Sequence, residues 1–178
     1  MEPGNAGTVS LDRWWAGWRT AYIEAAFGER WEEDDDPRTL FEKILHSELP
    51  DEETYIVARG DHTFALLNAY PYNSGHLMVL PLRAVGDLDE LSTDETAELW
   101  LMVQQAVTAV RKAYAPEGIN VGLNLGKAAG AGVPDHLHVH VVPRWSGDTN
   151  FMTAVAETRV LPEPLDRTWE RLKQAWPS

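Results

Sequence analysis

Residues 136–145 have the sequence His136-Leu137-His138-Val139-His140-Val141-Val142-Pro143-Arg144-Trp145. Histidines alternate with aliphatic residues until a proline ends the run. Because successive side chains of a β-strand point to opposite faces, a strand here places all three imidazoles on one face, about 6.5–7 Å apart. Leu137, Val139 and Val141 then point to the other face, into a core. The pattern predicts a half-buried strand with a histidine-lined face.

Three aligned histidines are typical of a metal site or of a site for phosphate chemistry. Histidine titrates near neutrality, and it can act as a base, a nucleophile or a metal ligand. A zinc site normally adds cysteine or carboxylate ligands. The sequence contains 0 cysteines, and Asp135 is the one carboxylate beside the histidines. We therefore favour phosphate chemistry over metal binding, and we expect no bound metal and no cofactor.

The composition is that of an ordinary globular protein, and the length of 178 residues fits one domain. No apolar run approaches the ~18 residues that a membrane helix needs. The N-terminus, Met1-Glu2-Pro3-Gly4-Asn5, lacks the basic and apolar regions of a secretory signal. We therefore expect a cytoplasmic protein that does not bind a membrane.

Acidic residues outnumber basic ones by 28 to 15, which gives a net charge of -13. Proteins that bind nucleic acid need clustered lysine and arginine, so we expect no nucleic-acid partner. A small phosphorylated ligand is compatible with this charge, because histidines and backbone N–H groups can hold phosphate locally.

The chain before the histidines begins with a small, polar segment at residues 1–10, which we expect to be a disordered tail. Residues 11–178 are expected to form a single domain with an N-terminal helical extension over residues 11–50. Its segment Leu11 to Trp31 carries aromatic residues at helical spacing, typical of docking or of a dimer interface. A second, short helix is expected over Thr39 to Ser47.

Strand patterns begin after residue 54 and alternate with turns. We expect strands at residues 55–58, 63–67, 76–80 and 119–125, besides the histidine strand. Ser92 and Glu95 form a capping box that starts a long helix, which ends at about Tyr114. Residues 168–176 are predicted to be a C-terminal helix. The order predicts an α+β fold, an antiparallel sheet with a long helix packed on it and extra N- and C-terminal helices.

The middle histidine, His138, is the candidate nucleophile. A nucleophilic histidine needs a neutral nitrogen that faces phosphorus and a partner for its other nitrogen. His136 and His140 flank the same face, where they can bind phosphate oxygens or protonate a leaving group. The glycine-rich loop from Gly126 to Gly132 can turn backbone N–H groups towards the phosphates.

These segments resemble the histidine triad (HIT) superfamily. Residues 136–142, HLHVHVV, have the form H-φ-H-φ-H-φ-φ, where φ is an apolar residue, and residues 68–81, NAYPYNSGHLMVLP, resemble the family's upstream strand–loop–strand segment. GLNLG at residues 122–126 resembles the strand before the triad loop. The resemblance covers residues 55–155, the expected domain core, and it is strongest to the bacterial diadenosine tetraphosphate (Ap4A) phosphorylase branch.

The resemblance implies a nucleotidyltransferase that acts on nucleotides or dinucleoside polyphosphates, and a homodimer. His138 would attack an α-phosphate and form a covalent nucleotidyl-histidine, which inorganic phosphate or water would resolve. With phosphate, Ap4A would give ADP and ATP. His136 and His140 would assist, one through the leaving group and one by orienting His138.

The resemblance also implies a set of nucleotide-binding residues. Asn68 matches the ribose-binding position, and Asn124 matches an asparagine near the phosphates. Trp145 matches an aromatic residue at the phosphate end. His76, of the Gly-His pair, would lie behind the residues that touch the substrate.

Several positions depart from the family pattern. Thr39 to Glu42 takes the place of a zinc-binding Cys-x-x-Cys pair and Ala84 that of a zinc-binding histidine, so we expect no zinc. Ala131 replaces a glycine, and Gly132 replaces a glutamine or serine that contacts phosphate, a loss of about 1–3 kcal/mol of hydrogen bonding. Two alternatives therefore stay open: a HIT-type hydrolase of Ap4A or a nucleoside phosphoramidate, and a nucleotide-binding protein with vestigial activity.

Overall fold

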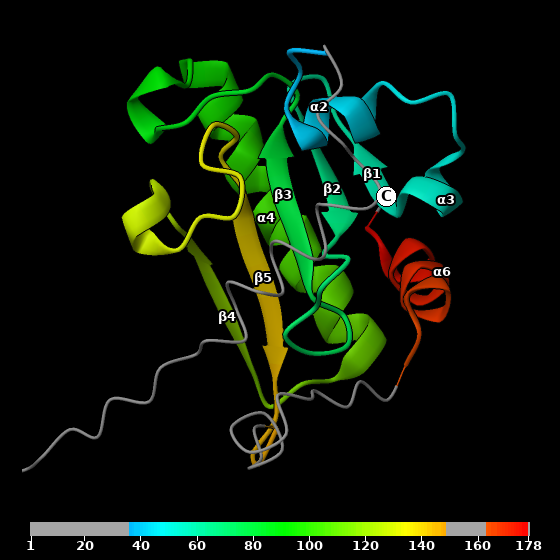
Figure 1. The fold of residues 1–178 in the computed structure, drawn as a ribbon. Coiled ribbons are helices and arrows are strands. Elements are labelled where there is room, and N and C mark those ends of the chain that lie inside the picture. Colours follow the sequence, from blue (N-terminus) through cyan, green and yellow to red (C-terminus); the bar gives the residue numbers. More distant parts are fainter. Residues whose placement is uncertain (1–35, 149–162, 178) are drawn as a thin grey trace, which may run out of the picture. The chain divides into compact units, whose positions relative to one another are not determined.

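The structure is a computed structural model that describes residues 36–148 and 163–177 (Figure 1). The expected tail at residues 1–10 and the tryptophan-rich helix at residues 11–31 lie outside the described residues. None of the described helices is long and apolar enough to cross a membrane.

The described chain forms an antiparallel five-stranded sheet with the order β1-β2-β3-β5-β4 (Figure 1). The strands are β1 (Ile56–Arg59), β2 (Thr63–Leu67), β3 (Leu77–Pro81), β4 (Gly118–Leu123) and β5 (Val139–Arg144). Each lies within two residues of its predicted bounds except β5, whose start is three residues later. The predicted antiparallel α+β fold is confirmed.

The helices are α2 (Leu40–Leu45), α3 (Asp51–Thr54), α4 (Thr93–Tyr114) and α6 (Leu165–Ala175), with short 3-10 turns η1 (Leu88–Glu90) and η2 (Lys127–Ala129). The predicted capping box starts α4: the Ser92 hydroxyl accepts from the Glu95 N–H at 3.2 Å, and the Glu95 carboxylate accepts from the Ser92 N–H at 2.8 Å. The long helix ends at Tyr114 and is capped by Ala115, which adopts a left-handed conformation with φ 44°.

Helices cover both faces of the sheet, and α4 runs behind it in Figure 1. On that face, apolar residues of α4 such as Leu99, Ala106 and Val110 pack on Val79 and Val139 of the sheet. On the other face, α2 covers β1 to β3, and a second cluster forms there from Phe41, Leu45, Phe64, Leu66, Met78 and Leu80. Alternate residues of each strand therefore enter different cores, as the period of a strand requires.

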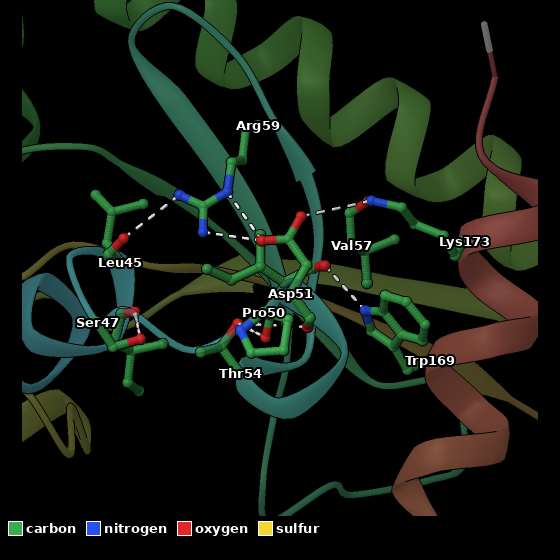
Figure 2. Close-up of polar contacts among 11 residues, drawn as sticks. Leu45, Ser47, Pro50, Asp51, Thr54, Val57, Arg59, Trp169 and Lys173 are labelled. Atoms are coloured by element: carbon green, nitrogen blue, oxygen red, sulfur yellow. Dashed lines mark hydrogen bonds and ion pairs between the residues drawn. The ribbon is translucent and has the colours of Figure 1, made fainter.

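The outer edge of β1 is covered by α3 and α6 (Figure 2). The Trp169 indole N–H donates to the Ile56 carbonyl at 2.9 Å, and the Lys173 ammonium donates to the Val57 carbonyl at 2.9 Å. Arg59 forms an ion pair with Asp51 of α3 at 2.9 Å. An exposed strand edge can pair with a strand of another chain, and these side chains block such pairing at the outer edge of β1.

The histidine segment departs from the predicted strand at its start. His136, Leu137 and His138 precede β5 and lie outside the sheet ladder, so the prediction of a strand from residue 136 is wrong there. The Leu137 N–H bonds the Val85 carbonyl at 2.7 Å, which draws this segment towards the chain after β3. The predicted alternation is confirmed, since Leu137, Val139 and Val141 are buried on the α4 face.

Candidate active site

His138 presents one ring nitrogen without a proton. Its Nδ1 lies 2.8 Å from the His136 carbonyl, and because a carbonyl only accepts, Nδ1 carries the proton. Nε2 therefore has its lone pair available, and no residue of the described ranges bonds it. The side chain is 6% exposed, and this burial lowers the pKa of His138 below the usual value of 6.5. At neutral pH His138 is therefore an uncharged imidazole with an unprotonated Nε2.

A chain of hydrogen bonds sets the protonation of His140. The Tyr72 N–H donates to Nδ1 of His76 at 3.0 Å, so the proton of a neutral His76 is on Nε2. That Nε2 lies 3.0 Å from Nδ1 of His140 and donates to it. His140 then keeps its proton on Nε2, away from His76. The rings of His138 and His140 meet edge to face, with centroids 5.0 Å apart, so a nucleophilic nitrogen and an N–H donor come from adjacent rings.

Asn68 belongs to the same cluster. It follows β2, and its backbone N–H donates to the His76 carbonyl at 3.1 Å. Its Oδ1 accepts from the Tyr70 N–H at 2.9 Å, and its Nδ2 lies 3.5 Å from Nδ1 of His76. The structure therefore brings Asn68 next to His76 and, through His76, next to His140.

His136 has both ring nitrogens engaged by the protein. Nε2 lies 2.9 Å from the Pro81 carbonyl and Nδ1 lies 2.8 Å from the Thr39 hydroxyl. The ring is fully buried, and this burial lowers the pKa of His136. In this structure His136 therefore has no ring nitrogen left over for a ligand.

Sequence reasoning missed the contacts that α2 makes with the triad. Thr39 is the N-cap of α2, and Phe41 packs edge-on against His136 with ring centroids 5.4 Å apart. The same phenylalanine lies 5.4 Å from the His138 ring. The Thr-x-x-Glu pattern at Thr39 and Glu42 was the available signal, since it predicts a capped helix start, but it does not say where the cap packs.

Asn124, Ala131 and Gly132 lie in or beside the loop between β4 and β5. Asn124 donates from Nδ2 to the Gly130 carbonyl at 3.5 Å, and the Ala131 N–H bonds the Gly126 carbonyl at 3.3 Å. Gly132 is exposed, and a Cβ added there would meet no atom within 4 Å. Among the described residues, none of these three forms a hydrogen bond with a histidine of the triad.

Trp145 lies at the end of β5 that is remote from the triad. It is five residues beyond His140, about 16 Å along an extended chain. Its ring packs on Tyr114 at a centroid distance of 6.4 Å, and the turn that follows is fixed by an ion pair between Arg144 and Asp148. The structure does not bring Trp145 to the histidines.

The positions expected to replace zinc ligands do come together. The Glu42 carboxylate accepts from the Thr39 N–H at 2.9 Å and from the Ala84 N–H at 3.3 Å, and Thr39 contacts His136. Thr39 and Ala84 offer no thiolate or imidazole, so the set does not fit zinc. Within residues 36–148 and 163–177, no three histidine, aspartate or glutamate side chains are arranged to hold a metal.

Comparisons with known proteins show which family the chain resembles. A model of the HIT domain matches residues 50–147. An AP-4-A phosphorylase of Mycobacterium tuberculosis is 44% identical over 167 residues, which cover 93% of this chain and 85% of that protein.

Two further matches are more distant. A bis(5'-nucleosyl)-tetraphosphatase [asymmetrical] of Schizosaccharomyces pombe is 36% identical over 84 residues, which cover 47% of this chain and 46% of that protein. The crystal structure of a hypothetical histidine triad nucleotide-binding protein from Sulfolobus tokodaii superposes with a TM-score of 0.62. It is 28% identical, with 76% of this chain and 89% of that chain covered.

Proposed function

The chain belongs to the HIT domain family, and on that premise we propose that it is a nucleotidyltransferase that cleaves Ap4A with inorganic phosphate to ADP and ATP. The observation that carries the proposal is the set of hydrogen bonds to two adjacent rings, from which their protonation follows. Nε2 of His138 is unprotonated, and the hydrogen bond from His76 keeps the proton of His140 on Nε2 of His140. The M. tuberculosis relative named AP-4-A phosphorylase, which matches most of the chain, supports the substrate.

The first step is attack of His138 on an α-phosphate. A bond forms between Nε2 and phosphorus, and the bond from phosphorus to the bridging oxygen breaks, so that ATP leaves as an anion. His138 keeps its Nδ1 proton, and the positive charge of the nucleotidylated ring faces the His136 carbonyl. His140 donates its Nε2–H to a phosphoryl oxygen, on which negative charge accumulates in the transition state.

The second step returns His138 to its starting form. An oxygen of inorganic phosphate attacks the same phosphorus from the opposite side, the bond to Nε2 breaks, and ADP leaves. Because the lone pair returns to Nε2, no net proton transfer to His138 is needed. His136 acts in both steps by holding its carbonyl towards Nδ1 of His138.

The remaining substrate contacts are also proposals. Asn68 is the proposed ribose ligand, supported by its place beside His76. Asn124, Ala131 and Gly132 are the proposed phosphate-side residues, on the strength of the family pattern. Trp145 keeps its proposed role at the phosphate end on that pattern alone, since in the structure it packs on Tyr114.

The assembly is proposed to be a homodimer, formed by pairing of two β4 strands. In the described part of the chain no strand pairs with the outer edge of β4, whereas side chains of α3 and α6 cover β1. Val121 of β4 is 42% exposed although it lies on the α4 face of the sheet. Sedimentation equilibrium that gives a monomer at micromolar concentration would contradict this assembly. A cytoplasmic location remains an expectation from the sequence, and so does the absence of a nucleic-acid partner, which is based on the net charge of -13.

Hydrolysis is the second candidate, and Gly132 is the residue that favours it, because no side chain there can position inorganic phosphate. To test the acceptor, Ap4A is incubated with the protein with and without phosphate, and the products are separated. ADP and ATP that appear only with phosphate support phosphorolysis. AMP and ATP in both conditions assign water as the acceptor. Failure to turn over Ap4A and nucleoside phosphoramidates, with nucleotide binding retained, would favour a binding protein.

A further inference from the structure

We propose that Thr39, held by Glu42, is a positioning residue that keeps the nucleophile His138 in its reactive tautomer by fixing His136. The inference rests on the proposed function, because it assigns a supporting residue to the nucleotidyl-transfer step. Neither residue touches the nucleophile. They act through a chain of hydrogen bonds that ends at Nδ1 of His138.

The chain begins at the first turn of α2. The Thr39 hydroxyl lies 2.8 Å from Nδ1 of His136, a residue 97 positions away in the sequence. Glu42 accepts from the Thr39 N–H through Oε2 at 2.9 Å and from the Ala84 N–H through Oε1 at 3.3 Å. The start of α2 is therefore bound to the segment that follows β3 as well as to the triad.

The segment after β3 holds the same histidine from its other side. Nε2 of His136 lies 2.9 Å from the Pro81 carbonyl, and the Leu137 N–H donates to the Val85 carbonyl at 2.7 Å. With both ring nitrogens and the adjacent amide held, the His136 peptide has one orientation. That orientation aims its carbonyl at Nδ1 of His138, at 2.8 Å.

The donor role of Thr39 follows from the tautomer of His136. A carbonyl only accepts, so the single proton of neutral His136 is on Nε2, towards Pro81, and Nδ1 needs a donor. The Thr39 hydroxyl has a single proton and two acceptors within reach, Nδ1 of His136 at 2.8 Å and Oε2 of Glu42 at 3.0 Å. The Nε2–H tautomer of His136 assigns that proton to Nδ1, and Oε2 of Glu42 then keeps the bond from the Thr39 N–H. If the hydroxyl is removed, a fully buried Nδ1 is unpaired, which favours rotation of the ring or transfer of its proton to Nδ1. Either change allows the His136 carbonyl to move away from Nδ1 of His138.

Two functions of Thr39 can be separated by substitution. It caps α2, and it donates to His136. Serine retains both functions. An ionised aspartate caps a helix as well as serine does but has no proton to donate. Valine has neither function. Thr108→Val is the matched control, because the exposed Thr108 hydroxyl bonds the Gln104 carbonyl of its own helix and no other group of the described residues.

The experiment measures the single-turnover rate of nucleotidyl-enzyme formation with Ap4A, together with kcat and KM, at a temperature where every variant is folded. We expect the single-turnover rate of Thr39→Ser to be within about twofold of the parent rate. We expect Thr39→Asp and Thr39→Val to lose roughly ten- to hundredfold in rate with KM little changed, as for other small displacements of a reacting group. Thr39→Asp with the rate of Thr39→Ser, or Thr39→Val with the parent rate, would overturn the proposal.

A spectroscopic measurement tests the same inference without activity. Long-range ¹H–¹⁵N spectra of the histidine rings report which nitrogen of His138 carries the proton. The parent and Thr39→Ser are expected to show the Nδ1–H tautomer alone, and Thr39→Val a mixture. A single Nδ1–H tautomer in Thr39→Val would overturn the positioning role. If the parent forms no nucleotidyl-enzyme, the proposed function fails, while the spectra still decide the role of Thr39.

Discussion

Nε2 of His76 lies 3.0 Å from Nδ1 of His140 and donates its proton to it, because Nδ1 of His76 accepts from the Tyr72 N–H. This one contact determines that His140 has a proton on Nε2, as a donor to phosphate requires. His76 is buried and is not part of the triad pattern.

Replacement of His76 tests that relationship. Glutamine places an amide N–H close to the position of Nε2, whereas leucine fills similar space without a donor. We expect His76→Leu to lower kcat by roughly ten- to hundredfold, because His140 then adopts either tautomer. We expect His76→Gln to retain most of the activity. Steady-state kinetics on Ap4A measures both, and equal loss in the two variants would show that only the packing of His76 matters.

Position 132 has room for the side chain that the family pattern places there. A Cβ at Gly132 meets no atom within 4 Å, so Gly132→Gln and Gly132→Ser are expected to fold normally. A new hydrogen bond to phosphate is worth about 1 kcal/mol, which corresponds to a KM for Ap4A or phosphate that is lowered about fivefold. Gly118→Ala, also in open space but at the far end of β4, is the control. An unchanged KM for both substrates in the two Gly132 variants would remove this residue from the site.

Stability is expected to fall as the pH drops below about 6.5, because burial lowers the pKa of both His136 and His138. The unfolded chain then binds more protons than the folded one, so acid favours unfolding. Each histidine contributes a slope of up to about 1.4 kcal/mol per pH unit in this window. Urea unfolding at several pH values measures the slope, and His138→Asn should reduce it. A free energy of unfolding that stays constant from pH 7 to pH 5 would contradict the buried, neutral histidines.

The side chains that cover the outer edge of β1 are expected to stabilise the fold. Trp169→Phe removes the N–H that bonds the Ile56 carbonyl and should lower the free energy of unfolding by about 1–2 kcal/mol. Trp100→Phe makes the same change at an exposed tryptophan of α4, which is 43% accessible. It should change the free energy of unfolding by less than about 0.5 kcal/mol. Chemical denaturation compares the two variants. Equal effects would mean that ring size, rather than the hydrogen bond, is what matters at position 169.

Local patterns were sufficient to predict most of the fold. The hairpin of β1 and β2, the Ser92 capping box and the alternation of Leu137, Val139 and Val141 each depend on neighbours in the sequence, and each is present. The start of β5 could not be predicted this way. It depends on the Val85 carbonyl, which takes the Leu137 N–H out of the sheet.

The same limit on prediction from local sequence applies to the candidate site. Alternation predicts that the histidines share a face, but the role of each ring depends on contacts with distant residues. Thr39 and Pro81 occupy both nitrogens of His136, and His76 determines the tautomer of His140. No spacing within the sequence encodes these partners, so the sequence indicates a candidate nucleophile but cannot distinguish the roles of its two neighbours.

The proposed mechanism requires that His138 is nucleotidylated during turnover. The most direct measurement is to mix the protein with Ap4A in the absence of phosphate, quench with acid-free denaturant within milliseconds to seconds, and locate added AMP by peptide mass spectrometry. We expect an adenylyl group on His138, its disappearance with release of ADP when phosphate is added, and no adduct in His138→Asn. An adduct on another residue, or turnover by His138→Asn at the parent rate, would contradict it.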